Sequence, residues 1–176
     1  FAKKLLNKSA IKICSVVGFP LGAMSTQSKA FEAKKAVENG ADEIDMVINI
    51  GFLKSKNYLA VLKDIIDVKL AINGKPLKVI IEISELSKNE IIKACEICVD
   101  AKADYIKTSS GLSNSGATLT AVKIIKKTVR DRIKIVAAGG INTIELAKKY
   151  INVGVHRIST TSDIKFSKNQ LSSETF

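Results

Sequence analysis

The 176-residue sequence contains no apolar run of roughly 18 residues, the length that a membrane-spanning helix needs. Its first residues, FAKKLLNKSA, also lack the apolar block and the cleavage site of a secretory signal peptide. We therefore expect a cytoplasmic protein without a membrane partner. With 46% hydrophobic residues, a chain of this length can build one good core but hardly two, so a single domain is expected.

Cysteine is scarce, with three residues in the chain. Cys95 and Cys98 form a CxxC pair, which invites a zinc or redox interpretation. The pair lies inside a long helical pattern, and neither a second CxxC nor a nearby histidine completes a set of metal ligands. We therefore expect free, buried or half-buried thiols and no metal.

Acidic residues are outnumbered, with 17 Asp and Glu against 28 Lys and Arg and a formal net charge of +11. Such an excess raises the question of nucleic-acid binding. All but three of the 28 cations are lysines, however, and they are scattered rather than clustered with aromatic residues. We expect a solvated lysine-rich surface and no nucleic-acid partner, with a mild attraction for phosphorylated substrates.

Apolar, β-branched segments alternate along the chain with segments of helical periodicity. The strand-like segments start at residues 11, 42, 77, 104, 133 and 155. The helical segments cover residues 25–39, 57–73, 87–101, 117–130 and 142–151. The spacing of the strand starts, roughly 20 to 35 residues, is that of a βα unit. Nearly continuous apolar strands that alternate with helices predict a parallel sheet covered by helices.

Local motifs agree with this assignment. The segments 87–90 (SKNE) and 142–145 (NTIE) have the form of a capping box at predicted helix starts. Gly40 and Gly74 fall at predicted helix ends, where glycine is favoured.

The parallel sheet could be an open doubly wound sheet or a closed barrel. No GxGxxG or Walker A loop follows the first strand, which argues against a nucleotide-binding open sheet. In a barrel, reactive groups gather at the carboxyl ends of the strands. Those ends carry Gly18, Asn49, Glu82, Lys107–Gly111, Gly139–Gly140 and Ser159–Ser162. We therefore predict an α/β protein with the (β/α)8 TIM-barrel fold.

The number of units is smaller than this fold requires. Six βα units cannot close a barrel that usually takes about 250 residues. We expect that the chain contains strands three to eight and that the two N-terminal units are missing. Residues 1–165 are then one partial barrel domain, and residues 166–176 are a C-terminal tail.

Asp45 and Lys107 are charged residues in the middle of predicted buried strands. Each could lie on an exposed strand face, but parallel strands in α/β proteins have both faces covered. An interior acid and an interior lysine make sense as a pair. A lysine that is removed from water can lose its proton and attack a carbonyl to form a Schiff base.

Five motifs carry a family resemblance: VVGFPLG, GADEIDMVINIGFLK, LKVIIE, ADYIKTSSG and AAGGI. In this order and spacing they closely resemble the deoxyribose-phosphate aldolases, class I aldolases of the (β/α)8 fold, over residues 1–165. The resemblance implies cleavage of 2-deoxy-D-ribose 5-phosphate to acetaldehyde and glyceraldehyde 3-phosphate without a metal or other cofactor. It implies a small phosphorylated sugar as partner, and a homodimer is a further expectation.

The resemblance also assigns residues. Lys107 falls on the Schiff-base lysine of the KTS motif, and Asp45 falls on the aspartate that assists proton transfer through a water. The positions that correspond to phosphate binding are Gly111, Gly139, Gly140, Thr161 and Ser162.

The sequence departs from the family at several positions. Val136 stands where the family has a second lysine, whose ammonium lowers the pKa of the nucleophile. Lys134 is expected in water at the bottom of the barrel rather than as a substitute. Ser159 replaces a glycine, and Phe176 replaces a tyrosine that some members have at the C-terminus.

Because of these departures, three interpretations stay open. The chain could be a deoxyribose-phosphate aldolase of reduced activity. It could be a catalytically degenerate barrel that binds phosphate or serves as a scaffold. It could also be a Schiff-base aldolase for another phosphorylated aldehyde.

Overall fold

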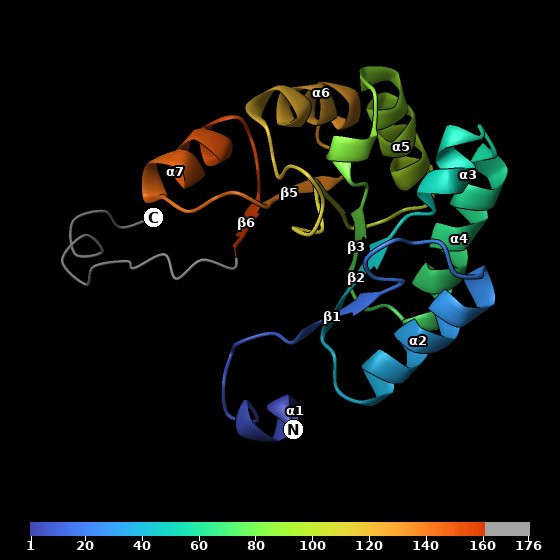
Figure 1. Ribbon diagram of the computed structural model, residues 1–176. Helices are drawn as coiled ribbons and strands as arrows, with labels where there is room; N and C mark the ends of the chain where they lie inside the picture. Colours follow the sequence, from blue (N-terminus) through green and yellow to red (C-terminus); the bar gives the residue numbers. More distant parts are fainter. Residues whose placement is uncertain (161–176) are drawn as a thin grey trace.

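Six parallel strands lie side by side in sequence order, β1-β2-β3-β4-β5-β6. The computed structural model describes residues 1–160. The strands are β1 (Cys14–Val17), β2 (Glu43–Val47), β3 (Leu77–Ile80), β4 (Tyr105–Lys107), β5 (Lys134–Ala138) and β6 (Arg157–Ser159). The sheet is curled, and Figure 1 shows its concave side left open.

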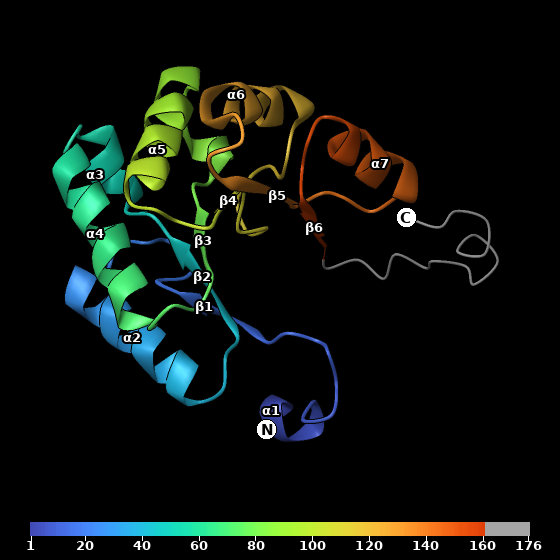
Figure 2. The same ribbon diagram turned by 180° about the vertical axis from the view of Figure 1, so that it is seen from behind.

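The helices that follow the strands all lie on the outer, convex side of the sheet, as both views show (Figures 1 and 2). They are α2 (Thr26–Glu38), α3 (Ile50–Lys54), α4 (Tyr58–Ala71), α5 (Lys88–Asp100), α6 (Leu119–Val129) and α7 (Ile144–Asn152). The short α1 (Ala2–Leu5) precedes β1. A doubly wound sheet would have helices on both faces. One-sided cover and sequential strand order therefore confirm the predicted TIM-barrel type, here as a partial barrel.

The strands alternate between two environments with a period of two residues. In β2, Ile44 and Met46 are fully buried in the core between sheet and helices. In β4 the same holds for Ile106. Asp45 lies between Ile44 and Met46, and Lys107 directly follows Ile106, so both charged side chains face the concave side. The interior of the partial barrel therefore holds the charged side chains of β2 and β4.

Most local predictions are confirmed, and one is wrong. Ser87 caps α5 in a complete capping box with Glu90. The predicted box at Asn142 does not form, because α7 begins one residue later. Thr143 has the extended N-cap backbone there, and its side chain accepts a hydrogen bond from the N–H of Leu146.

Two further findings concern residues 1–160. No helix of this part of the chain is long and apolar enough to cross a membrane. Cys95 and Cys98 are buried and not bonded to each other, as expected. The predicted domain boundary at residue 165 lies outside the described residues, so it stays a prediction.

Candidate active site

Asp45 and Lys107, the predicted catalytic pair, come together on the concave face. Their strands, β2 and β4, are not neighbours, because β3 lies between them. The Nζ atom of Lys107 lies 2.7 Å from Oδ2 of Asp45, so the ion pair bridges over β3. Asp45 is 4% exposed, and the Lys107 side chain keeps 12% of its surface accessible. The pair is therefore largely removed from water, yet the lysine can still be reached.

Lys78 is a third member of this cluster, and sequence analysis missed it. Its Nζ lies 2.6 Å from Oδ1 of Asp45 and 2.8 Å from Oε2 of Glu43. The Sγ of Cys14 also donates to Oδ1 of Asp45, at 3.0 Å. Both oxygens of the Asp45 carboxylate are thus occupied. The signal was present in LKVIIE, since a lysine in an apolar strand shares the alternation that identified Lys107.

The charges of the cluster follow from burial and pairing. Burial acts to raise the pKa of Asp45, but attraction to Lys107 and hydrogen bonds from Lys107 and Lys78 outweigh it and lower the pKa. Burial opposes the charge of Lys78, but its hydrogen bonds to Asp45 and Glu43 raise its pKa above the ordinary value. Burial raises the pKa of Cys14 to about 11. At neutral pH the cluster holds a carboxylate, the Lys78 ammonium and an uncharged thiol.

A second ion pair joins β6 to β2 across the concave side of the sheet, at the first residue of each strand. The Nη1 of Arg157, in β6, donates to both carboxylate oxygens of Glu43, in β2, at 2.9 and 2.8 Å. The guanidinium also lies over the ring of Tyr105, 4.6 Å from its centroid. Opposite charges thus alternate from Arg157 through Glu43 and Lys78 to Asp45, which fixes the orientation of the aspartate.

Beyond Lys107 the chain is tied to the end of β5. The Oγ1 of Thr108 donates to the carbonyl of Ala138 at 3.1 Å and accepts from its N–H at 3.0 Å. Ala138, which provides this carbonyl and this N–H, is buried. The start of the loop after Lys107 is therefore fixed against the strand that leads into the two glycines.

Three of the predicted phosphate-binding residues gather at this end. A Cβ atom placed on Gly139 would lie 3.8 Å from the Cα of Gly111, so these two glycines are close. Gly140 follows directly, and all three have positive φ angles. Cβ atoms on Gly111 or Gly140 would meet no atom within 4 Å, so both border open space. Thr161 and Ser162 lie outside the described residues.

The position at which the resemblance implies a second lysine lies beside Lys107. Val136 is the β5 residue in register with Lys107, and it is 3% exposed. Lys134 is exposed, as expected, with its Nζ 5.6 Å from the ring centroid of Tyr105. Ser159 is half-buried in β6, whereas Phe176 lies outside the described part of the chain.

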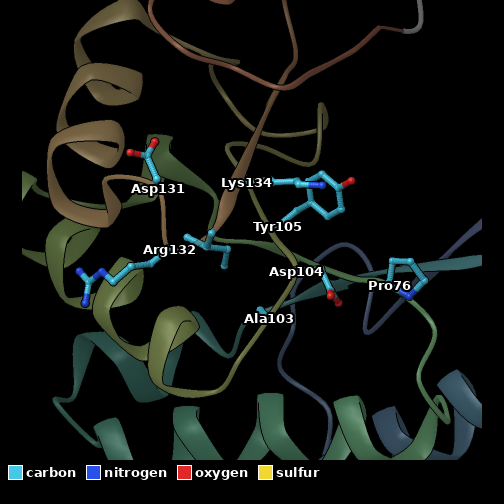
Figure 3. A pocket seen from close by; sticks show the side chains of 8 residues that line it. Pro76, Ala103, Asp104, Tyr105, Asp131, Arg132 and Lys134 are labelled. Carbon is cyan, nitrogen blue, oxygen red and sulfur yellow. The ribbon is translucent and has the colours of Figure 1, made fainter.

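A pocket of about 380 Å³ opens at the opposite ends of the strands. It is lined by Pro76, Ala103, Asp104, Tyr105, Asp131, Arg132, Ile133 and Lys134, which precede or begin β3, β4 and β5 (Figure 3). Its acids already have partners, since Asp104 pairs with Lys69 and Asp131 with Lys126. In barrels this face serves stability rather than catalysis. The pocket is therefore separate from the Lys107 cluster.

The comparisons with known proteins agree with the geometry. A family model described as "DeoC/LacD family aldolase" matches residues 1–159. The deoxyribose-phosphate aldolase of Finegoldia magna is 56% identical over 163 residues, which are 93% of this chain and 76% of that protein. The corresponding protein of Clostridioides difficile is 50% identical and covered to 74%.

Solved structures show the same similarity. An aldolase called QR15 is 41% identical, with a TM-score of 0.90, over 97% of this chain and 80% of that one. The deoxyribose phosphate aldolase of Aeropyrum pernix, described as a unique tetramer, is 31% identical, with a TM-score of 0.81. The alignment with it covers 91% of this chain and 68% of that one. The expected homodimer stays a prediction.

Proposed function

The chain belongs to the DeoC/LacD aldolase family, and from this premise we propose that it cleaves 2-deoxy-D-ribose 5-phosphate to acetaldehyde and glyceraldehyde 3-phosphate. The observation that carries the proposal is the pair of Lys107 and Asp45, 2.7 Å apart inside the partial barrel. Relatives that are named deoxyribose-phosphate aldolase support an active aldolase rather than a degenerate barrel.

In the proposed reaction the neutral amine of Lys107 attacks C1 of the open-chain aldehyde to give a carbinolamine, which loses water to form an iminium. Removal of the proton from the C3 hydroxyl then breaks the C2–C3 bond. The electron pair of that bond moves toward the iminium, which leaves an enamine on Lys107 and releases glyceraldehyde 3-phosphate. Protonation at C2 and hydrolysis release acetaldehyde and restore the amine.

Asp45 is proposed to move protons in these steps, directly or through a water. Its Oδ1 is held by Lys78 and Cys14, while Oδ2 faces Lys107. We infer that Lys78 keeps this carboxylate in place beside Lys107, so that a proton can be exchanged at Oδ2.

The phosphate group is proposed to bind at the glycine-rich end of the barrel. Gly111 lies beyond the end of β4, and Gly139 and Gly140 directly follow β5. Gly111 and Gly140 border open space. Backbone N–H groups in turns with positive φ angles are suited to an anion. Thr161 and Ser162 are proposed to complete this phosphate site, in keeping with the barrel habit of binding phosphate after the last two strands.

The test is a cleavage assay with the full-length chain that follows acetaldehyde release from 2-deoxyribose 5-phosphate. A small panel of other sugar phosphates is assayed beside it. We expect the highest kcat/KM for 2-deoxyribose 5-phosphate and no turnover by Asp45→Asn above about one per cent of the wild-type rate, which corresponds to about 2.7 kcal/mol. A clear preference for another sugar phosphate would replace this substrate, and no turnover of any would refute the proposal.

A further inference from the structure

Glu82 has an unusual backbone and an unusual environment. It lies just beyond the carboxyl end of β3, with φ 52° and ψ 70°. This left-handed conformation is disfavoured for a residue with a Cβ atom. The residue is also 3% exposed, although it carries an acidic side chain. A left-handed backbone and a buried acidic side chain are both unfavourable, so they occur only where surrounding contacts stabilise them.

Those contacts all lead to one loop. Oε2 of Glu82 accepts from the backbone N–H of Ser110 at 3.1 Å, and Oε1 accepts from Oγ of Ser113 at 2.8 Å. Ser84, two residues after Glu82, also hydrogen-bonds the Ser113 hydroxyl, at 2.8 Å. The end of β3 thus holds the middle of the loop that follows Lys107.

The far end of the same loop is fixed against the two glycines. The N–H of Ala117 donates to the carbonyls of Ala138 and Gly139, at 2.9 and 3.1 Å. A Cβ atom on Gly116 would lie 2.2 Å from the carbonyl carbon of Gly139, so only glycine allows this approach. Between these points, Gly111 borders open space. Glu82 is therefore the side-chain anchor that holds Gly111 beside Gly139.

We propose that Glu82 is a positioning residue that sets the preference of the site for phosphorylated over unphosphorylated substrates. This inference rests on the proposed function, because it assigns the open space beside Gly111 and Gly140 to the substrate phosphate. A loop that is held in its binding conformation before the ligand arrives binds more tightly than one that must be ordered. Glu82 carries the same sign of charge as phosphate, so it acts through the loop and not by attraction.

The test compares substrates as well as variants. Glu82→Ala removes both anchors, and we expect its KM for 2-deoxyribose 5-phosphate to rise about tenfold. Its kcat/KM for unphosphorylated 2-deoxyribose should change by less than about twofold, since that substrate makes no use of the phosphate site. Glu82→Gln should rescue the selectivity, because an amide can accept from Ser110 and donate to Ser113.

Two further variants provide controls. Glu85→Ala removes an exposed acid of the same short turn (Ile83–Glu85) and should leave both substrates unaffected. Ser113→Ala removes the hydroxyl that bonds Glu82 and Ser84 but keeps the bond between Glu82 and Ser110, and it should raise the KM for the phosphorylated substrate about threefold. If Glu82→Ala does not fold, Ser113→Ala tests the proposal in its place.

Equal losses on both substrates in Glu82→Ala and Ser113→Ala would overturn the proposal, and so would an unchanged KM. Binding of glycerol 3-phosphate, measured by calorimetry, separates this result from the proposed function. If the wild-type chain cleaves no 2-deoxyribose 5-phosphate but Glu82→Ala weakens glycerol 3-phosphate binding about tenfold, the aldolase proposal fails and the role of Glu82 stands. If cleavage occurs without this selective weakening, only the role of Glu82 fails.

Discussion

Two buried lysine–aspartate pairs lie on opposite sides of the same sheet. Lys107 and Asp45 meet on the concave face, whereas Lys29 of α2 and Asp64 of α4 meet on the convex side, where these helices lie side by side (Figure 1). The outer pair is 2.5 Å apart, with side chains 0% and 2% exposed. The ammonium of Lys29 also donates to the carbonyl of Val47, at the end of β2, at 2.9 Å.

The same two residue types thus serve different purposes. The outer pair is sealed, and Oδ1 of Asp64 has no hydrogen-bond partner among the described residues. Burial lowers the pKa of Lys29, and its bond to Asp64 opposes that effect. In the inner pair the carboxylate is shared by two ammonium groups, and Lys107 is accessible. A lysine that reacts must be reached and must exchange its proton, so the accessible inner pair fits the proposed catalytic role and the sealed outer pair fits a structural one.

Breaking the outer pair should give the largest effect on stability. Lys29→Met leaves the Asp64 carboxylate buried without its cation, and we expect the free energy of unfolding to fall by about 3–5 kcal/mol. The folded fraction should keep its kcat, because the pair lies behind the sheet. Urea unfolding and a cleavage assay below the transition measure the two quantities.

Lys34→Met, at an exposed position of the same helix, is the matched control and should change stability by less than about 0.5 kcal/mol. Adding Asp64→Leu to Lys29→Met should restore part of the loss, since no charge is then left buried. A Lys29→Met protein of wild-type stability, or one with a reduced kcat when folded, would contradict the comparison.

Removing Lys78, the second ammonium that pairs with Asp45, should affect the rate more than the fold. In Lys78→Met the Oδ1 atom of Asp45 loses its ammonium partner, so the carboxylate is no longer fixed beside Lys107 and we expect kcat/KM to fall about 100-fold, or about 2.7 kcal/mol. Lys88→Met, at the exposed start of α5, is the control. An unchanged rate would show that Lys78 does not position Asp45 for the reaction.

Adding a cation beside Lys107 should have a smaller effect of the opposite sign. Val136→Lys places the second lysine that the resemblance implies in register with Lys107, and we expect the cleavage rate at neutral pH to rise about tenfold, or about 1.4 kcal/mol. Val136→Met controls for the change of size. If both variants lose activity equally, the valine is required by packing and the missing lysine does not limit the rate.

The smallest effect is the acid dependence of stability. The pKa of Asp45 in the folded chain lies below its ordinary value of 3.8, so its contribution to stability is present above that value and is lost as the pH falls through the folded pKa. Urea unfolding at about pH 6 and about pH 3 should show a smaller decrease for Asp45→Asn than for the wild type. If stability decreases equally in both proteins, Asp45 is not the source of the acid sensitivity.

The architecture and the inner pair of Asp45 and Lys107 could be predicted from the pattern of the sequence. Near-continuous apolar strands, helical spacing and polar strand ends predict a barrel, and charged residues in the middle of strands with both faces covered predict Asp45 and Lys107 as an interior pair. The contact of Lys78 with Asp45 depends on the register between β2 and β3, in which Asp45 and Lys78 are partners. The motif LKVIIE places a lysine in an apolar strand, but no local pattern encodes this register, so the contact of Lys78 with Asp45 was missed.

Other features depend on the tertiary environment. Lys29 stands in a polar-looking helix segment, and only the packing of α2 against α4 shows that it is buried. Glu82 was noted at a strand end, but its left-handed backbone and its bonds to the loop cannot be inferred from its neighbours in sequence. At the start of α7, Asn142 and Thr143 are both good caps, and only the backbone conformation selects Thr143.

The most direct test of the account is borohydride reduction of the folded, full-length protein in the presence of acetaldehyde, followed by mass analysis of its peptides. If the accessible Lys107 forms the Schiff base, we expect a stable adduct on the peptide that contains Lys107, none on the peptide that contains Lys29, and no adduct at this site in Lys107→Met. Recovery of the Lys107 peptide only in its unmodified form would contradict the proposal that this lysine forms the Schiff base.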